Sequence, residues 1–211
     1  MNEQFTIAIP KETLAGMPTV EFQGTINLID TPEAARKALA FLSERDIVGF
    51  DTETRPNFRK GQNHKVALVQ ISTENRCFLF RLCNIGLMPE MCEFFENPNI
   101  TKIGLSLKDD FHNLHKINEF NPEGFIELQN MVRDYAITDS SLQKIYGILF
   151  GQRISKGQRL TNWEAAELTE PQKRYAALDA WACLHIYKHL TSGGFVPEES
   201  PYHAPRPEVA E

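Results

Sequence analysis

The stretch Ile47-Val48-Gly49-Phe50-Asp51-Thr52-Glu53-Thr54 decides the fold. Its first four residues have little polarity and do not alternate, which predicts a short strand buried on both faces. Because side chains alternate along a strand, Asp51 and Glu53 should point to the same face at the strand's end. Two carboxylates there repel each other and lose solvation, so a bound cation or a proton is expected to offset the cost. Taken alone, the stretch is also compatible with an ordinary acidic turn after a strand.

The composition limits the class of protein. The 211 residues suffice for one good core, and no apolar run approaches the length of a membrane span. The N-terminus lacks the basic and apolar regions of a signal peptide, and the four cysteines show neither CxxC nor zinc-ligand spacing. We therefore expect reduced thiols, a cytoplasmic location, no membrane and no obligate protein partner. A net charge of −6 argues against a protein that coats nucleic acid, although it permits a local basic track.

The pattern around the central strand predicts an α/β fold, a mixed sheet flanked by helices. Further strands are expected at 66–71, 77–80 and 100–105, the first two joined as a meander. Helices are expected near 31–42, 89–97, 109–118, 128–136, 141–150 and 171–190. The domain organisation predicted is an N-terminal arm over 1–24, a folded domain over 25–190 and a flexible Gly-, Pro- and Glu-rich tail over 191–211.

Two loops are basic and contain no acid. The loop 54–65 carries Arg55, Arg59, Lys60, His64 and Lys65, and the loop 151–162 carries Arg153, Lys156 and Arg159. Such loops could track a polyanion, although solvated loops are often basic without any such role.

Asp109 and Asp110 stand where a predicted strand gives way to a helix. Asp110 shares its helical face with Leu114, which turns it toward the core, whereas Asp109 shares its face with Asn113 and Lys116. Asp110 is therefore the better candidate for a buried site. Either acid could simply favour the positive end of the helix, and for Asp109 that interpretation is preferred.

Tyr175 and Asp179 lie four residues apart on the last long helix, on a face that is otherwise apolar. A carboxylate on a buried face needs a partner, and a tyrosine one turn earlier can place its hydroxyl in the same pocket. A Tyr–Asp pair on the surface is the alternative if this helix is viewed alone.

In chain order, these motifs resemble the DEDD superfamily of 3′–5′ exonucleases, tyrosine subclass. Within it they are most similar to the Werner-syndrome-type exonuclease domain and ribonuclease D. Asp51-Thr52-Glu53 looks like the first motif, 104–114 with Asp110 like the second, and Tyr175-Ala176-Ala177-Leu178-Asp179 like the third. The resemblance covers about residues 26–190 and includes the connecting segments 65–71 and 161–173. The histidine subclass has a histidine where this chain has Tyr175.

The resemblance implies a ribonuclease H-like fold and an exonuclease domain over 25–190. It implies hydrolysis of terminal phosphodiester bonds at a free 3′ end, single-stranded or recessed, with release of nucleoside 5′-monophosphates. Two divalent ions, Mg²⁺ or Mn²⁺, would stabilise the attacking and leaving oxygens. The catalytic residues implied are Asp51, Glu53, Asp110, Tyr175 and Asp179, of which the four acids are the metal ligands.

The roles within this set differ. Asp51 would bridge both ions, Glu53 and Asp179 would hold the ion that activates water, and Asp110 would support the second. Tyr175 would orient the water, because a phenol with a pKa of about 10 is a poor base at neutral pH. The substrate-binding residues expected in the basic loops are Arg55, Arg59, Lys60, Lys65, Arg153, Lys156 and Arg159.

Two other classes of function remain open at this point. A binding module that kept the fold but lost catalysis would not need the complete acidic set with Tyr175. An endonuclease of the ribonuclease H type would not need the Tyr-x-x-x-Asp helix, and it would cleave a circular strand. The sequence does not separate DNA from RNA as the substrate, since contacts to a 2′-hydroxyl cannot be identified.

Overall fold

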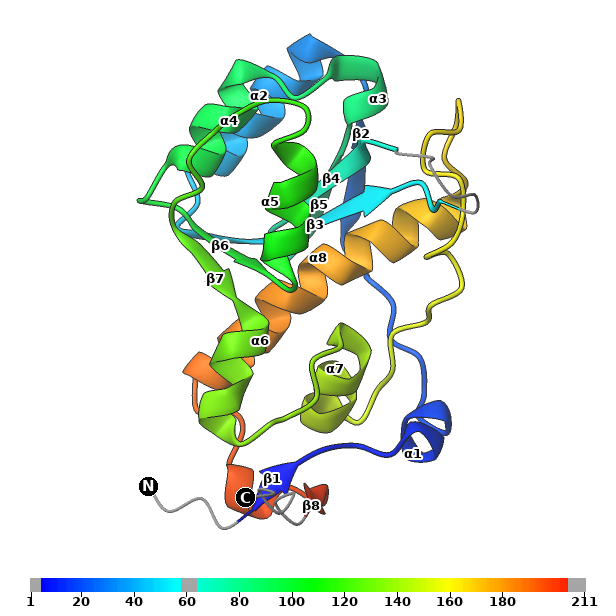
Figure 1. The fold of residues 1–211 in the computed structure, drawn as a ribbon, viewed down its shortest axis with the longest axis vertical. Helices are drawn as coiled ribbons and strands as arrows, with labels where there is room; N and C mark the ends of the chain where they lie inside the picture. The colour runs from blue at the N-terminus through cyan, green and yellow to red at the C-terminus, as the bar shows by residue number, and fades with distance from the viewer. Residues whose placement is uncertain (1–4, 58–63, 205–211) are drawn as a thin grey trace, which may run out of the picture.

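The centre of the molecule is a six-stranded mixed sheet, seen in a computed structural model that describes residues 5–57 and 64–204. The strands are β2 (Thr25–Ile29), β3 (Ile47–Thr54), β4 (Val66–Ser72), β5 (Arg76–Arg81), β6 (Thr101–Gly104) and β7 (Phe125–Glu127). Their order is β2-β5-β4-β3-β6-β7 (Figure 1). β4 and β5 form the predicted antiparallel meander, and β3 also pairs antiparallel with β4. β2, β6 and β7 join these strands in parallel. The predicted α/β class with a mixed sheet is confirmed.

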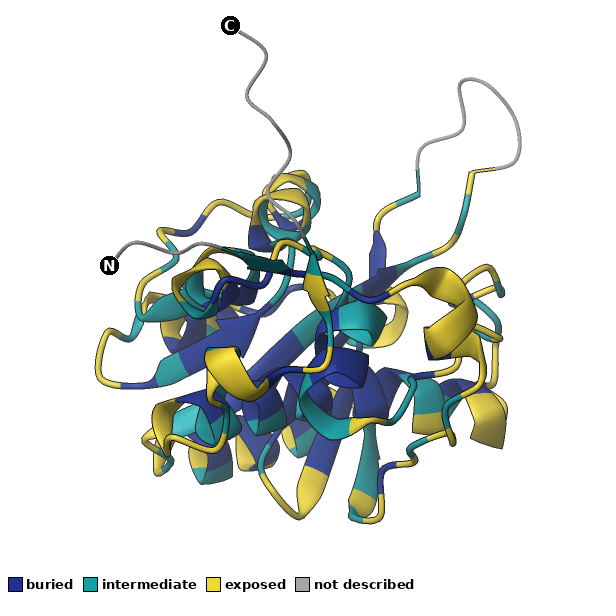
Figure 2. Ribbon diagram, turned by 90° about the horizontal axis from the view of Figure 1, so that it is seen from below, coloured by how far each residue is buried: buried dark blue, intermediate teal, exposed yellow. Residues whose placement is uncertain are grey.

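Helices cover both faces of this sheet. One face packs against α2 (Pro32–Ser43), α3 (Leu82–Ile85), α4 (Pro89–Glu96) and α5 (Leu107–Leu114). The other packs against α6 (Leu128–Met131), α7 (Leu142–Phe150) and α8 (Glu170–Thr191). β4 is buried along its whole length, and the strands in the middle of the molecule are largely dark blue in Figure 2. Among the residues described, no helix is both long and apolar enough to cross a bilayer.

Local sequence signals account for several helix ends. The Thr31 hydroxyl accepts a hydrogen bond from the Ala34 amide at the start of α2. Thr169 and Gln172 form a reciprocal capping box at the start of α8, where the sequence also places a proline. α5 begins at Leu107, two residues before the predicted start, and is shorter than the predicted 109–118.

The two ends of the described part of the chain pair with each other as strands. β1 (Thr6–Ile7) pairs antiparallel with β8 (His203–Ala204), and α1 (Lys11–Ala15) follows β1. A short 3-10 turn over 197–199 precedes β8. The expectation of a flexible tail over 191–211 was therefore wrong for 191–204, because Phe195 and Tyr202 pack against the core. Residues 205–211 lie outside the described residues.

Candidate active site

Three carboxylates, those of Asp51, Glu53 and Asp179, meet at the end of β3 and form an acidic group. One oxygen from each of Asp51, Glu53 and Asp179 lies within 4.8 Å of the other two. Asp51 and Glu53 come from alternate positions of the strand, as predicted from its periodicity, and Asp179 comes from α8, which crosses that face of the sheet (Figure 1). Oxygen donors in this number and spacing suit a hard divalent cation.

Gly49 sets how closely α8 approaches β3. A Cβ atom at Gly49 would lie 1.9 Å from the carbonyl oxygen of Ala180, the residue after Asp179. Only glycine permits this contact, which brings the helix backbone onto the strand two residues before Asp51. The acidic group therefore depends on a close helix–strand approach as well as on its carboxylates.

Gly49→Ala is expected to destabilise the protein by about 1–3 kcal/mol or more, because its methyl group would push α8 away from β3. Urea unfolding measures the loss, and activity should fall with it. Gly16→Ala is the control, since a Cβ at Gly16 meets nothing closer than 3.6 Å. Equal stability of both variants would contradict the contact.

Asp110 approaches the site from α5, on the other side of β3. The Thr52 hydroxyl donates a hydrogen bond to Asp110 Oδ1, and the charge of Asp51 is close enough to raise the pKa of Asp110. Asp110 is half-buried while its neighbour Asp109 is exposed. The structure thus turns Asp110, rather than Asp109, toward the acidic group.

Burial raises the pKa of all four acids. The pKa of Asp51 lies well above its ordinary value because of desolvation first and the charge of Asp179 second. Desolvation and then the charge of Asp51 also raise the pKa of Glu53 and of Asp110. Desolvation raises the pKa of Asp179 as well, and the nearby Tyr175 hydroxyl offsets part of this rise. The repulsion among these groups is what a divalent cation would relieve.

The buried atoms also fit a cation. Asp179 is almost fully buried, and its Oδ1 has no hydrogen-bond partner within the described part of the chain. A buried carboxylate oxygen without a partner is costly unless a proton or a cation takes that place. The donor set therefore agrees with a divalent metal centre held by Asp51, Glu53 and Asp179, with Asp110 beside it.

These pKa shifts predict an opposite pH dependence with and without metal. A carboxyl whose pKa is raised in the folded state stabilises the fold at low pH, and this stability is lost as the pH rises through the raised value. In chelator, the melting temperature should therefore fall as the pH rises above about 4, the ordinary carboxyl pKa. The shift caused by Mn²⁺ should instead grow with pH, because the ion replaces protons. Thermal melts from pH 5 to 8.5 measure both, and a metal shift independent of pH would contradict the assignment.

A cavity of about 350 Å³ opens in front of the acids. It is lined by Asp51, Tyr175 and Asp179, together with Lys156 and Arg159 from the second basic loop. The positive charge of Lys156 offsets part of the desolvation that raises the pKa of Asp179, and that of Arg159 offsets part of the rise in the pKa of Glu53. The Tyr175 ring lies 6.1 Å from the ring of Trp163, which is fully buried. The cavity thus combines an acidic wall with cations suited to phosphate.

Three other basic residues predicted to bind substrate, Arg55, Lys65 and Arg153, lie elsewhere. Arg55 pairs with Glu164 at 3.3 Å, and Arg153 Nε donates to the Met17 carbonyl oxygen at 3.0 Å. Lys65 lines a separate cavity with Glu164. Arg59 and Lys60 fall outside the described residues. The structure therefore brings Lys156 and Arg159 to the acids, while Arg153 ties its loop to the N-terminal segment.

Two supporting residues had no signal in the sequence. Glu127 accepts hydrogen bonds from the backbone amides of Ser106 at 3.0 Å and Leu107 at 2.8 Å, which fixes the start of the helix that carries Asp110. The buried Arg81 donates to the backbone carbonyls of Ala165 and Ala166. Both contacts join segments more than 15 residues apart, so local motifs could not reveal them.

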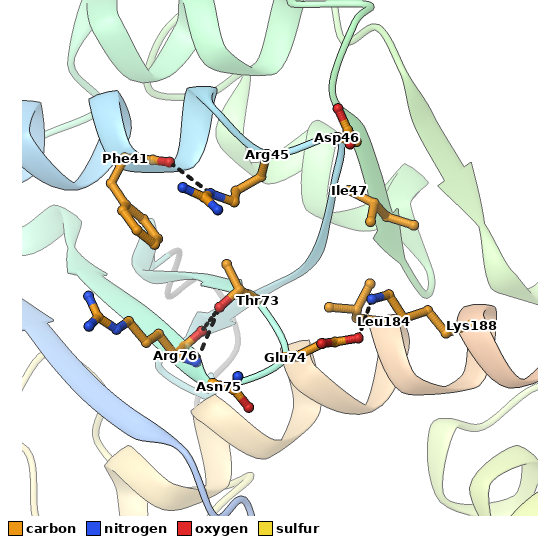
Figure 3. Close-up of a pocket in the computed structure, with 10 residues that line it drawn as sticks. All are labelled: Phe41, Arg45, Asp46, Ile47, Thr73, Glu74, Asn75, Arg76, Leu184 and Lys188. Atoms are coloured by element: carbon orange, nitrogen blue, oxygen red, sulfur yellow. Dashed lines mark hydrogen bonds and ion pairs between the residues drawn. The ribbon is translucent and has the colours of Figure 1, made fainter.

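A cavity of about 440 Å³ at the start of β3 lacks these features (Figure 3). Its Lys188 pairs with Glu74, and Arg45 donates to the carbonyl oxygen of Phe41. No pair of carboxylates converges there among the residues that line it. The carboxylates that could hold a metal ion lie at the other end of β3.

The comparisons with known proteins assign the family. A family model described as 3′–5′ exonuclease matches residues 26–193, and the chain belongs to this family. The mouse bifunctional 3′–5′ exonuclease/ATP-dependent helicase WRN is 31% identical over 188 residues, which cover 84% of this chain and 13% of that protein. A 3′–5′ exonuclease of Arabidopsis thaliana is 29% identical over 82% of this chain and 66% of its own length. The chain thus spans only part of these relatives.

Solved structures show the same fold. The Aedes aegypti Nibbler EXO domain superposes with a TM-score of 0.74 at 21% identity, covering 86% of this chain and 97% of that one. Escherichia coli RNase D gives a TM-score of 0.72 at 21% identity, covering 80% and 44%. The family and the ribonuclease H-like fold expected from the sequence motifs are confirmed.

Proposed function

We propose that this 3′–5′ exonuclease domain removes nucleoside 5′-monophosphates from a free 3′ end, using two divalent ions, Mg²⁺ or Mn²⁺. The observation that supports the metal centre is the convergence of the carboxylates of Asp51, Glu53 and Asp179. Oδ1 of Asp179 also has no hydrogen-bond partner among the residues that the structure describes. Asp110, held by Thr52, completes the proposed ligands. When bound, the ions would stabilise the attacking and leaving oxygens of the phosphodiester.

The residues of the chain supply orientation and substrate binding. Tyr175, which lines the same cavity as Asp179, would orient the attacking water. Burial and the nearby carboxylates raise the pKa of Tyr175 above its ordinary value, so the hydroxyl keeps its proton and does not act as a base. Lys156 and Arg159, which line the same cavity, would bind the phosphates of the terminal nucleotides.

Digestion of 5′-labelled oligonucleotides tests this function. We expect a ladder that shortens from the 3′ end with Mg²⁺ or Mn²⁺ and no cleavage in chelator. A circular single strand should survive, and its cleavage would favour an endonuclease of the ribonuclease H type. Binding without cleavage would instead favour a module that has lost catalysis, against which the complete acidic set argues.

The same assay with matched DNA and RNA, single-stranded and recessed, defines the substrate. Among similar folds, one Trypanosoma brucei RNase D structure is a complex with RNA, which makes RNA a necessary arm of the test. The cytoplasmic location and the lack of an obligate protein partner stay predictions.

Replacing Lys156 and Arg159 by alanine is expected to raise the Michaelis constant and to flatten its salt dependence. Each lost phosphate contact on a single strand should reduce the slope against log salt by about 0.7, because fewer counterions are released. Lys37→Ala is the control, since Lys37 is exposed on α2 and pairs with Glu33. A change in turnover number alone would mean that the two cations do not bind the substrate.

A further inference from the structure

Gln70 is a buried amide without a partner. Its side chain is 0% exposed in the middle of β4, and neither Oε1 nor Nε2 has a hydrogen-bond partner among the residues that the structure describes. Native proteins rarely leave a buried amide unpaired, and such a group needs a structural or functional explanation. The surroundings of Gln70 supply one.

The register of the sheet places Gln70 directly opposite Asp51. β3 and β4 are antiparallel, and the two residues are partners in the ladder. Directly opposed residues of such a pair project to the same face, with Cβ atoms about 4.5–5.5 Å apart. Gln70 therefore lies beside Asp51, the carboxylate at the centre of the acidic group, and on the same face of the sheet.

The other residues around Gln70 on this face do not need its amide. Leu68 precedes it by two residues on β4, and Leu79 is its partner on β5, and both are apolar and fully buried. The Ser72 hydroxyl, two residues further along β4, donates to the Thr73 carbonyl oxygen at 2.9 Å. Asp51 is the polar residue paired directly with Gln70 in the ladder.

We propose that Gln70 is a positioning residue for Asp51, its Nε2 donating a hydrogen bond to one buried water that in turn donates to the Asp51 carboxylate. Gln70 would then hold one carboxylate oxygen of Asp51 in place, and the other oxygen would point into the cavity. The inference rests on the proposed function, because it gives Gln70 the task of supporting a metal ligand. A neutral amide suits this task, since a lysine or arginine there would compete with the cation for the same charge. Groups that orient a ligand in this way commonly contribute 10–100-fold to metal affinity.

Gln70→Met tests the proposal, because it keeps the length of the side chain and removes both polar atoms. We expect Mn²⁺ affinity, measured from the EPR signal of free Mn²⁺, to fall about 10–100-fold. The melting temperature in chelator should stay nearly the same, because the variant loses the hydrogen bond toward Asp51 together with the cost of burying the amide. Gln70→Leu provides a second apolar side chain should the methionine variant fold poorly. Ser72→Ala, on the same strand and face, should leave Mn²⁺ affinity unchanged.

The outcomes separate this inference from the proposed function. Unchanged Mn²⁺ affinity in a folded Gln70 variant would overturn the role of Gln70 while the wild type still binds the ion and degrades nucleic acid. Lower stability in chelator with unchanged affinity would also overturn it, since Gln70 would then serve packing alone. A wild-type protein that binds no Mn²⁺ would overturn the proposed metal centre and the role of Gln70 with it.

Discussion

Asp51→Asn should lower the turnover number by about 10³-fold or more while the protein stays folded. Asp51 is the carboxylate that all the others surround, and its charge raises the pKa of both Glu53 and Asp110. The asparagine keeps the shape but removes the charge that a cation needs, and loss of such a preorganised electrostatic group typically costs 10²–10³-fold even where no metal is involved. Steady-state digestion of a labelled oligonucleotide at saturating Mg²⁺ measures the effect.

The controls for this prediction lie in the same site. In chelator, Asp51→Asn should be no less stable than the wild type, since it removes the repulsion with Glu53 and Asp179. Asp110→Asn should also be strongly impaired, whereas Asp109→Asn, on the exposed side of α5, should be nearly normal. Near-normal turnover in folded Asp51→Asn would refute the proposed centre, and the reverse order of Asp109 and Asp110 would refute the choice between them.

Tyr175→Phe should lower turnover about 10²–10⁴-fold and leave Mn²⁺ affinity almost unchanged. The substitution removes one hydroxyl and keeps the ring against Trp163. The carboxylates stay in place, but the water loses the group that orients it, and a positioned catalytic group typically contributes by this amount. Single-turnover rates at saturating Mn²⁺, together with a Mn²⁺ titration, measure the two effects separately.

Asp179→Asn, one helical turn later, is the matched comparison. It should weaken Mn²⁺ binding as well as turnover, because it removes a carboxylate of the acidic group. An equal loss of Mn²⁺ affinity in Tyr175→Phe would place the hydroxyl in the metal centre. Full activity in Tyr175→Phe would remove the tyrosine from the mechanism.

The elements that carry the acids could be predicted because their signals are local. The apolar run before Asp51 and the capping residues before α8 act within a few positions. The edge strands β2 and β7 were not predicted, since each is only half-buried and is stabilised by pairing with a strand distant in the chain. Sequence periodicity does not report such a partner.

The supporting contacts of the site were hidden for the same reason. Gly49 is needed because the backbone of Ala180 packs directly against it. Glu127 is needed because it accepts a hydrogen bond from the backbone amide at the start of α5. The basic residues show the limit most clearly. Arg55 and Arg159 have the same charge in the sequence, but Arg55 pairs with Glu164, 109 positions away, while Arg159 lines the cavity. The charge of a residue alone does not indicate whether the folded protein pairs it with an acid or places it in the cavity.

The pairing of β1 with β8 has a consequence for protein engineering. Thr6 and Ala204 are direct partners, so the two ends of the described chain leave the molecule at one corner (Figure 1). A short linker between them should give a circular permutant, because adjacent surface termini tolerate such rewiring. New ends could then be opened in an exposed turn such as the one between β4 and β5, at Glu74 and Asn75. Tags or sensors placed there would stand at the end of the sheet opposite the acids.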